Sequence, residues 1–403
     1  MNPLAPPDVR RPTVSRRPPT DVVIVGAGPA SSLAALVLAR AGARVRIVDR
    51  ARFPREKLCG DTLNPGALAY LDRLGLADGI RARALPVSGM IVTGPDGVRV
   101  VGEYAGDIRG AAIVRSALDL YLLDAAMAAG AQFDPGALVR GPVVDDNGRV
   151  AGVRVAAGTT QCDLRARLVI AADGRHSRLA FHLGLASYAP RPRRWAFGAY
   201  YTDVDGLTSC GEMHIRSDGY IGVAPVPGGL TNVCVVRELG SMLRAHRTDA
   251  DTLIEQAIAS DPLLRERFVG ARRVTAVTVL GPLAVEARSA GVPGLLLAGD
   301  AAGFIDPMTG DGLRFAIRGA QLAAQHALRE IETGRPMHGE LDEARRREFA
   351  GKWRLNRLLR TLVASPRAVS LAASISAGWN APVRALIAIA GDVREVRRAR
   401  KVA

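Results

Sequence analysis

Residues 21–49 are the segment that most restricts the possible folds of this chain. The run "DVVIVGAGPA" is an apolar strand that leads into a glycine turn, and a helix over about residues 31–40 and a second apolar strand, "ARVRIVD", are expected to follow. Gly26 permits the tight turn, and Gly28 lets the backbone approach a pyrophosphate, whose charge is favoured by the N-terminus of the next helix. The segment therefore predicts a strand–helix–strand unit that binds a dinucleotide.

An acidic residue stands where the second strand ends. Asp49 follows Gly28 by about 20 residues, the spacing at which a carboxylate accepts hydrogen bonds from a ribose hydroxyl. Because Asp49 would repel a 2′-phosphate, the pattern favours NAD or FAD over NADP. Arg50 beside it could pair with a 2′-phosphate and so leaves NADP open. Ser31 occupies the third glycine position, which serves helix-to-strand packing, so we expect a small adjustment there. The glycine motif taken alone has an ordinary strand–helix turn as its alternative.

Two later apolar strands also end in an acidic residue. "ARLVIAADG" ends at Asp173 and Gly174, and "LLLAGD" ends at Asp300. The second strand is followed by the glycine-rich "AAGFIDPMTGDGL" and by a helix expected from about residue 311 to residue 333. An aspartate at a strand end is commonly a capped turn, so these segments indicate function only in combination with others.

The formal charge of +15 does not by itself indicate a nucleic-acid partner. Only three of the 54 basic residues are lysines, and no aromatic stacking surface is interleaved with the basic segments at residues 9–20 and 393–403. We interpret these segments as solvated tails, with attraction to an anionic membrane surface as the alternative.

The four cysteines show neither CxxC spacing nor a nearby histidine cluster, so no metal site is expected. The N-terminus lacks the apolar run of a secretory signal, and no segment has the roughly 20 uninterrupted apolar residues of a membrane span. The sequence predicts a cytoplasmic protein, with peripheral contact at the inner face of the cell membrane as a further hypothesis.

Three separated segments together resemble the FAD-dependent oxidoreductases of the para-hydroxybenzoate hydroxylase-like superfamily. They are "GAGPAS" with "VDR", "AADGRHSR", whose later motif arginine falls at Ala180, and "GDAAGFIDPMTGDGL". A fourth segment, "FPREKLCGDTLNPGAL", is similar to the KxCGD segment of the geranylgeranyl reductase branch. "DGYIGVAPVPGG" stands where that branch carries a substrate-facing strand, here without its tryptophan. The resemblance extends from residue 21 to about residue 333.

The resemblance implies an α/β fold in which a Rossmann-like, glutathione-reductase-like FAD-binding domain carries an inserted, mostly antiparallel β substrate domain and a helical C-terminal region. The expected boundaries are 1–20 for a disordered basic tail, 21–189 and 281–335 for the discontinuous FAD-binding domain, 190–280 for the substrate domain, and 336–403 for the C-terminal region. Aromatic, turn-rich strands in 190–280 agree with the insertion.

The resemblance also implies the residues of a flavin site. Reduced flavin carries negative charge at its pyrimidine edge, where a helix N-terminus would stabilise it, and Asp300 would bond ribityl hydroxyls. Lys57 and Cys59 are the catalytic candidates. The alternative for Lys57 is a solvated side chain in a loop, and the alternative for Cys59 is a small buried apolar residue. The expected cofactor-binding residues are Gly26, Gly28, Pro29, Ala30, Ser31, Asp49, Arg50, Cys59, Gly60, Asp61, Arg115, Asp173, Gly299, Asp300, Gly310, Gly312 and Leu313. The expected substrate-binding residues are Trp195, Tyr200, Tyr220 and Pro225, although aromatic residues at strand spacing are equally good sheet core.

The leading functional interpretation is a geranylgeranyl reductase-like enzyme that uses FAD to transfer hydride to or from a carbon–carbon bond of a hydrophobic substrate. NAD(P)H would be a transient electron donor, because only one dinucleotide fingerprint is present. The alternative is a class A flavin monooxygenase acting on an aromatic or polyketide substrate. The KxCGD segment and the long, unusually apolar C-terminal stretch at residues 358–391 disfavour it. A flavin-dependent halogenase is less favoured because no WxWxIP segment is found. A nicotinamide dehydrogenase would leave the Gly-Asp segment unused, and a redox-inactive FAD-binding protein would share the motifs.

Overall fold

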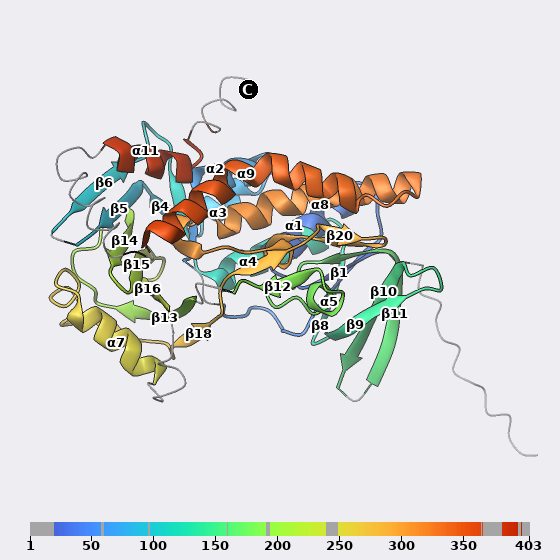
Figure 1. Ribbon diagram of the computed structural model, residues 1–403, viewed down its shortest axis with the longest axis horizontal. Coiled ribbons are helices and arrows are strands. Elements are labelled where there is room, and N and C mark those ends of the chain that lie inside the picture. Colours follow the sequence, from blue (N-terminus) through green and yellow to red (C-terminus); the bar gives the residue numbers. More distant parts are fainter. Residues whose placement is uncertain are drawn as a thin grey trace, which may run out of the picture.

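The computed structural model describes residues 20–57, 60–95, 97–158, 160–190, 194–238, 249–363, 365, 381–393 and 396. A helix-covered sheet and a second sheet lie side by side in it (Figure 1). The basic tail was expected to include Thr20, but Thr20 already begins the first strand, and residues 1–19 lie outside the described ranges. Cys59 and most of the basic segment 393–403 also lie outside them.

The first sheet has eight strands in the order β20-β21-β11-β1-β2-β8, and β10 and β9 continue from β11. Its strands are β1 (Thr20–Val25), β2 (Val45–Asp49), β8 (Gln132–Pro135), β9 (Leu138–Val144), β10 (Val150–Ala157), β11 (Thr160–Ala171), β20 (Gly291–Val292) and β21 (Leu295–Leu297). β1 pairs in parallel with β2 and β11, and β11 with β21. The residues that follow these strands, Gly26, Asp173 and Asp300, therefore share one edge of the sheet, where ligands of such sheets bind.

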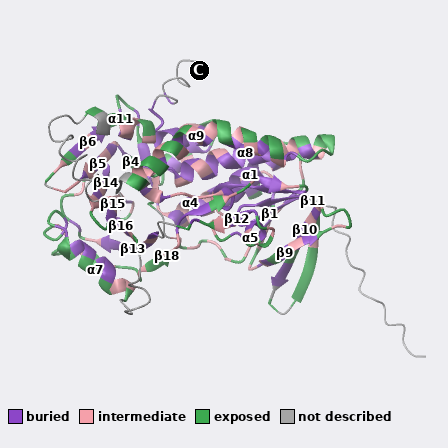
Figure 2. Ribbon diagram, viewed as in Figure 1, coloured by how far each residue is buried: buried purple, intermediate pink, exposed green. Residues whose placement is uncertain are grey.

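The first sheet is covered on both faces. Val22 and Ile24 of β1 pack with α1 (Pro29–Arg40), α4 (Arg115–Ala128) and α8 (Gly312–Thr333), whereas Val23 and Val25 pack with the β9–β10 hairpin and α5 (Arg178–His182). Burial on both faces explains why β1 is apolar at every position. α9 (His338–Val363) lies along α8, and its outward surface is exposed, whereas β1 and β21 are almost entirely buried (Figures 1 and 2). α1 begins two residues earlier than predicted, because Pro29 suits the first helical position.

The second sheet contains strands from two distant parts of the chain. Its order is β17-β13-β16-β15-β14-β5-β6, with β18 also paired to β13. The strands are β5 (Gly89–Thr93), β6 (Arg99–Glu103), β13 (Arg194–Thr202), β14 (Cys210–Arg216), β15 (Gly219–Val226), β16 (Leu230–Glu238), β17 (Arg272–Arg273) and β18 (Thr278–Leu280). The expected boundaries assign β5 and β6 to the FAD-binding domain, but β5 pairs in parallel with β14. We therefore propose a division in which residues 89–103 join the substrate domain of residues 190–280.

Shorter elements connect the two sheets. They are α2 (Pro65–Asp72), α3 (Ala77–Arg81), the small sheet of β3 (Thr62–Leu63), β7 (Gly110–Ala112) and β4 (Leu85–Val87), the pair β12 (Ala186–Tyr188) and β19 (Val285–Ala287), and the 3₁₀ turns η1 (Gly299–Ala302) and η2 (Pro307–Thr309). α7 (Ala250–Ser260) covers one face of the second sheet, and α11 (Ala381–Ala390) lies against β6 (Figure 1). Within the described ranges, no helix has both the length and the apolar character needed to cross a bilayer.

Candidate active site

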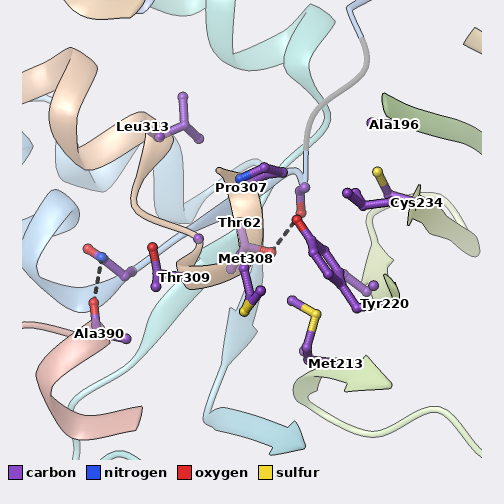
Figure 3. A pocket seen from close by; sticks show the side chains of 18 of the residues that line it. Thr62, Ala196, Met213, Tyr220, Cys234, Pro307, Met308, Thr309, Leu313 and Ala390 are labelled. Atoms are coloured by element: carbon purple, nitrogen blue, oxygen red, sulfur yellow. Dashed lines mark hydrogen bonds between the residues drawn. The ribbon is translucent and has the colours of Figure 1, made fainter. Parts of the chain in front are cut away.

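A cavity of about 430 Å³ lies between the two sheets. At one end it is lined by the glycine turns that follow the strands of the first sheet. At the other end it is lined by apolar side chains of the second sheet and by α11. Figure 3 shows Tyr220, Met213, Cys234 and Ala196 on the side of the second sheet, and Thr309, Leu313 and Ala390 across the cavity from them.

The turn after β1 is fixed by close backbone packing. Gly26 has φ +95°, and a Cβ atom there would lie 2.6 Å from the carbonyl oxygen of Ala172. Ser31 donates its hydroxyl to that same oxygen at 3.2 Å, which explains how serine serves at the third glycine position. Gly28, Pro29 and Ala30 then line the cavity at the start of α1. The start of α1 therefore presents its backbone to a ligand, as the sequence predicts.

Asp49 holds this turn against the second strand. One carboxylate oxygen accepts the Ala27 N–H at 2.7 Å, and the other accepts the Ala51 N–H at 2.8 Å. Each oxygen can accept a further hydrogen bond, so the carboxylate remains suited to a ribose hydroxyl. Arg50 beside it is exposed.

Several cations converge on the glycine end of the cavity. Lys57, Arg115 and Arg175 line it, and the buried Nε of Arg175 has no hydrogen-bond partner among the described residues. Arg115 pairs with Asp119 at 2.8 Å, and the same carboxylate also receives Arg55 at 3.0 Å. Burial and, secondly, the Arg115 charge lower the pKa of the Lys57 ammonium. Asp119 and Asp300 thus face these four cations, an arrangement that suits an anionic ligand.

The segment from Gly299 to Leu313 forms the opposite wall of this end. A Cβ atom at Gly299 would lie 2.8 Å from the Cβ of Ala30, so only glycine allows this turn to approach α1. Gly310 has φ +66°, and a Cβ there would meet nothing within 4 Å. Asp300, Gly310, Gly312 and Leu313 all line the cavity, and α8 begins at Gly312. The N-terminus of α8 therefore opens onto the cavity.

Two residues expected at the cofactor lie behind the cavity wall. Asp173 accepts the Arg178 N–H at 2.9 Å at the start of α5, and its neighbours Ala172 and Gly174 line the cavity in its place. Asp61 is fully buried with φ +51°, while Gly60 and Thr62 on either side of it line the cavity. In this structure the two aspartates therefore do not line the cavity, and their contact with the cofactor stays a prediction. Cys59, next to Gly60, lies outside the described residues.

The Asp61 carboxyl joins the two domains. One oxygen accepts the Tyr200 hydroxyl at 2.5 Å and the Asn232 amide at 2.6 Å, and its other oxygen has no partner among the residues described. Burial raises the pKa of Asp61 to about 6, and the hydrogen bonds from Tyr200 and Asn232 oppose that rise. Asp61 combines a left-handed backbone conformation with a carboxyl group removed from water. Both raise the free energy of the folded state, so the neighbouring residues must hold Asp61 in place.

Tyr220 lines the substrate end and is oriented by a buried ion pair. Its hydroxyl donates to one oxygen of Asp306 at 2.6 Å, and Arg194 donates to the other oxygen at 3.0 Å. Asp306 also accepts the Met308 N–H at 3.0 Å, which fixes the η2 turn at the cavity. A side chain of the substrate wall is thereby connected to the turn that leads into α8.

The other three expected substrate residues do not line the cavity. Along β13, Trp195, Phe197 and Tyr201 face α7, because side chains alternate between the faces of a strand. Tyr200 lies on the cavity side, but its hydroxyl is bonded to Asp61 behind the wall. Pro225 is also absent from the lining. Trp195, Tyr200 and Pro225 therefore do not line the cavity in this structure, and their contact with a substrate stays an untested prediction.

The cavity lining includes residues that the sequence patterns did not indicate. They are Met90, Val92, Val98 and Val100 from β5 and β6 and the loop between them, Asn232 from β16, and Leu386, Ile387 and Ala390 from α11. The apolar run at residues 90–92 in β5 suggests a strand, but its pairing with a strand more than 100 residues later cannot be read from the sequence.

These features fit FAD. Glycine backbone opens onto the cavity at Gly28 and Gly310, cations meet at one end, and a helix N-terminus faces the cavity, as an anionic dinucleotide requires. A family model described as an FAD binding domain matches residues 19–355. The chain belongs to this FAD-binding family.

Two curated relatives of the chain are reductases. The chain is 33% identical over 325 residues to a menaquinone reductase of Mycobacterium tuberculosis, covering 76% of each chain. It is 30% identical over 325 residues to a digeranylgeranylglycerophospholipid reductase of Thermoplasma acidophilum, covering 78% of this chain and 79% of that one. This FAD-binding chain is therefore an FAD-dependent oxidoreductase.

Solved structures show the same fold. A geranylgeranyl bacteriochlorophyll reductase-like protein of Thermoplasma acidophilum has a TM-score of 0.74 and 25% identity, covering 87% of this chain and 89% of its own. The flavin-dependent halogenase CmlS has a TM-score of 0.80 and 22% identity, covering 95% of this chain and 76% of its own. The second similarity concerns the fold alone.

Proposed function

We propose that this oxidoreductase is a reductase that adds hydrogen across a carbon–carbon double bond of an apolar, isoprenoid-type substrate. The supporting observation is one cavity whose glycine end fits FAD and whose other end is lined by valine, leucine, isoleucine and methionine side chains. When bound, the flavin supplies hydride chemistry, and the protein has to bind, orient and exclude water. The reductases among its relatives support the same assignment.

We assign the cofactor contacts to the backbone-rich end. Gly26, Gly28, Pro29 and Ala30 would hold the pyrophosphate at the N-terminus of α1, with Ser31 fixing that helix to the sheet. Asp49 would accept a hydrogen bond from a ribose hydroxyl, and Asp300 would accept hydrogen bonds from the hydroxyls of the ribityl chain. Gly299, Gly310, Gly312 and Leu313 would bound the ring, whose pyrimidine edge is favoured by the α8 N-terminus. Gly60 would line the cofactor, and Asp61 and Asp173 would support this end from behind.

Two cations have electrostatic roles in this proposal. Arg115, held by Asp119, would attract the anionic cofactor from α4. Lys57, whose pKa is lowered by burial, would place a positive charge beside the ring and Asp300. Lys57 and Cys59 remain the catalytic candidates, and Arg50 remains a candidate for the outer edge of the ribose.

The substrate would lie against the second sheet and α11. Tyr220 is the one predicted substrate residue that we retain, because its ring lines the cavity and its hydroxyl is fixed by Asp306. A fixed aromatic ring beside apolar neighbours orients a hydrocarbon chain without offering it a new hydrogen bond.

The electron donor and the cellular location are proposed from the sequence motifs and from the apolar character of the substrate. A single dinucleotide fingerprint supports NAD(P)H as a transient donor without its own domain. An apolar substrate supports a cytoplasmic enzyme that contacts the inner face of the cell membrane peripherally through its C-terminal region, with no nucleic acid as a partner.

The test starts with the visible spectrum of the purified protein after FAD is added. The bound flavin is then reduced in the absence of oxygen, and either a polyprenyl quinone or an aromatic phenol is supplied. Anaerobic reoxidation by the polyprenyl compound, with two hydrogen atoms added to the prenyl side chain rather than to the quinone ring, supports the reductase, because reduction of the ring to a quinol also adds two hydrogen atoms. Reoxidation that requires oxygen and hydroxylates the phenol would instead establish a monooxygenase, and absence of flavin binding would refute both.

A further inference from the structure

Lysine is rare in this chain, and its two described examples lie at or beside the cavity. Only three of the 54 basic residues are lysines. Lys57 lines the cavity, and Lys352 donates to the carbonyl oxygen of Ala390, which also lines it. Since arginine supplies nearly all other positive charge, the use of lysine here indicates a need for its particular geometry.

Lys352 is surrounded by acceptors from two elements. Its ammonium lies 2.6 Å from Asp311 and 3.1 Å from Asp392, and it donates to the carbonyl oxygens of Ile389 at 3.2 Å and Ala390 at 2.9 Å. The residue is only 7% exposed. A compact ammonium can direct its three protons at such a convergent set, whereas a planar guanidinium cannot.

The two groups of acceptors belong to opposite walls. Asp311 directly precedes α8, whose first residues Gly312 and Leu313 line the glycine end of the cavity. Ile389 and Ala390 end α11, which also lines the cavity with Leu386 and Ile387.

A second side chain repeats the connection. Asn64 donates to Asp311 at 3.2 Å and to Ala390 at 2.9 Å, the latter bond being dashed in Figure 3. Arg314 of α8 adds a bond to Asp392 at 2.8 Å. The end of α11 is therefore fastened to the start of α8 by buried polar contacts.

α11 lies beyond the residues that the FAD-binding family model matches. The family match ends at residue 355, so it includes Lys352 but not the α11 wall. Ile387 packs so closely on β6 that a Cβ at Gly102 would lie 2.5 Å from its Cδ1. This wall is held by Lys352 together with Asn64, Arg314 and the packing of Ile387 on β6.

We propose that Lys352 is a positioning residue that couples the occupancy of the flavin site to the position of the α11 wall of the substrate cavity. FAD at the N-terminus of α8 would order the segment around Asp311, and Lys352 would transmit that order to residues 389–392. A change in the position of α11 would likewise alter the affinity for FAD, since coupling between two sites is reciprocal. The role of α11 as a substrate wall rests on the proposed function, but the coupling itself concerns FAD alone.

Hydrogen–deuterium exchange on the full chain tests the coupling without any substrate. The amides of Gly391 and Asp392 donate within the end of α11, to Ile387 and Ile389. Saturating FAD should slow their exchange by roughly fivefold or more. In Lys352→Met the same addition of FAD should leave the exchange unchanged, and FAD should bind at least about fivefold more weakly. Lys352→Arg should not restore the effect.

Arg149→Met is the matched control. Arg149 pairs with the buried Glu330 at 2.9 Å, away from the cavity, so this variant loses a comparable ion pair and should retain the FAD-dependent protection. If Lys352→Met does not fold, Asp392→Asn and the wild-type comparison carry the test. FAD binding with unaltered exchange at Gly391 and Asp392 overturns the coupling alone. Absence of FAD binding overturns the proposed function as well, so the two failures are distinguishable.

Discussion

One end of the cavity is formed mainly by backbone and the other mainly by side chains. The flavin end depends on the backbone: Gly26 and Gly310 have positive φ, and Gly299 approaches α1 where a side chain would collide. The substrate end depends on side chains from β5, β14–β16 and α11, which reach it from distant parts of the sequence. A site built from backbone tolerates almost no substitution at its turns, whereas a site built from side chains is sensitive to which face each residue occupies.

The largest effect is expected at Gly26. An alanine there requires a left-handed backbone and a Cβ atom 2.6 Å from the Ala172 carbonyl oxygen, which is itself backbone and cannot rotate away. Strain and overpacking together should lower the free energy of unfolding by about 5 kcal/mol. Chemical denaturation and the FAD content of the purified Gly26→Ala protein measure this.

Gly42→Ala separates the two causes. Gly42 also has a positive φ, +84°, but a Cβ there would meet nothing within 4 Å. It should cost only about 1 kcal/mol and leave FAD binding intact. Equal losses in the two variants would show that the close approach at Ala172 is unimportant, and the contrast between the two ends would weaken.

Asp306 stands between the two ends. Asp306→Ala removes an ion-pair partner of buried Arg194 and the acceptor of the Tyr220 hydroxyl at once. Breaking such a pair should cost about 4 kcal/mol of unfolding free energy. Tyr220→Phe loses one hydrogen bond and should cost about 2 kcal/mol, with a rise in KM for the apolar substrate. A double variant that loses much less than the sum would verify that the two residues act together.

The carboxyl of Asp61 predicts a pH dependence. Its pKa is raised from 3.8 to about 6, so folding favours the neutral form. The stabilisation is complete below pH 4 and is lost as the pH rises through about 6, a change of about 3 kcal/mol. Relative to Asp61→Asn, whose side chain does not ionise there, the wild type should become less stable between pH 4 and 6.5. Parallel stability curves for the two proteins in that interval would exclude this account.

The flavin end was largely predictable because its signals are local. The glycine turn after β1, Asp49 at the end of β2 and Asp300 after β21 each follow an apolar strand within a few residues. Local order could not reveal that Asp61 and Asp173 turn behind the wall, since that depends on Tyr200, Asn232 and the start of α5. The partner of Ser31 is likewise 141 residues away.

The substrate end was predicted less well because the face that each strand residue occupies is set by pairing. Tyr220 was assigned to the cavity by its motif, whereas Trp195 was assigned by its aromatic character, which suits either face of β13. The pairing of β5 with β14 and the return of α11 to β6 join segments that no local pattern connects. Sequence reading therefore finds a backbone-built turn more readily than a wall assembled from distant strands.

The smallest effect is expected at Trp195, and it tests this assignment of faces. Its ring packs on Gly281, where a Cβ would lie 2.3 Å from the indole, and it belongs to the cluster beneath α7. Trp195→Phe should lower the free energy of unfolding by about 1 kcal/mol while KM for the apolar substrate and the affinity for FAD stay unchanged. Tyr220→Phe, which alters an aromatic side chain that lines the cavity, is the comparison variant. A change in substrate preference for Trp195→Phe but not for Tyr220→Phe would mean that the substrate contacts the face of β13 that packs on α7. The proposed position of the substrate would then be wrong.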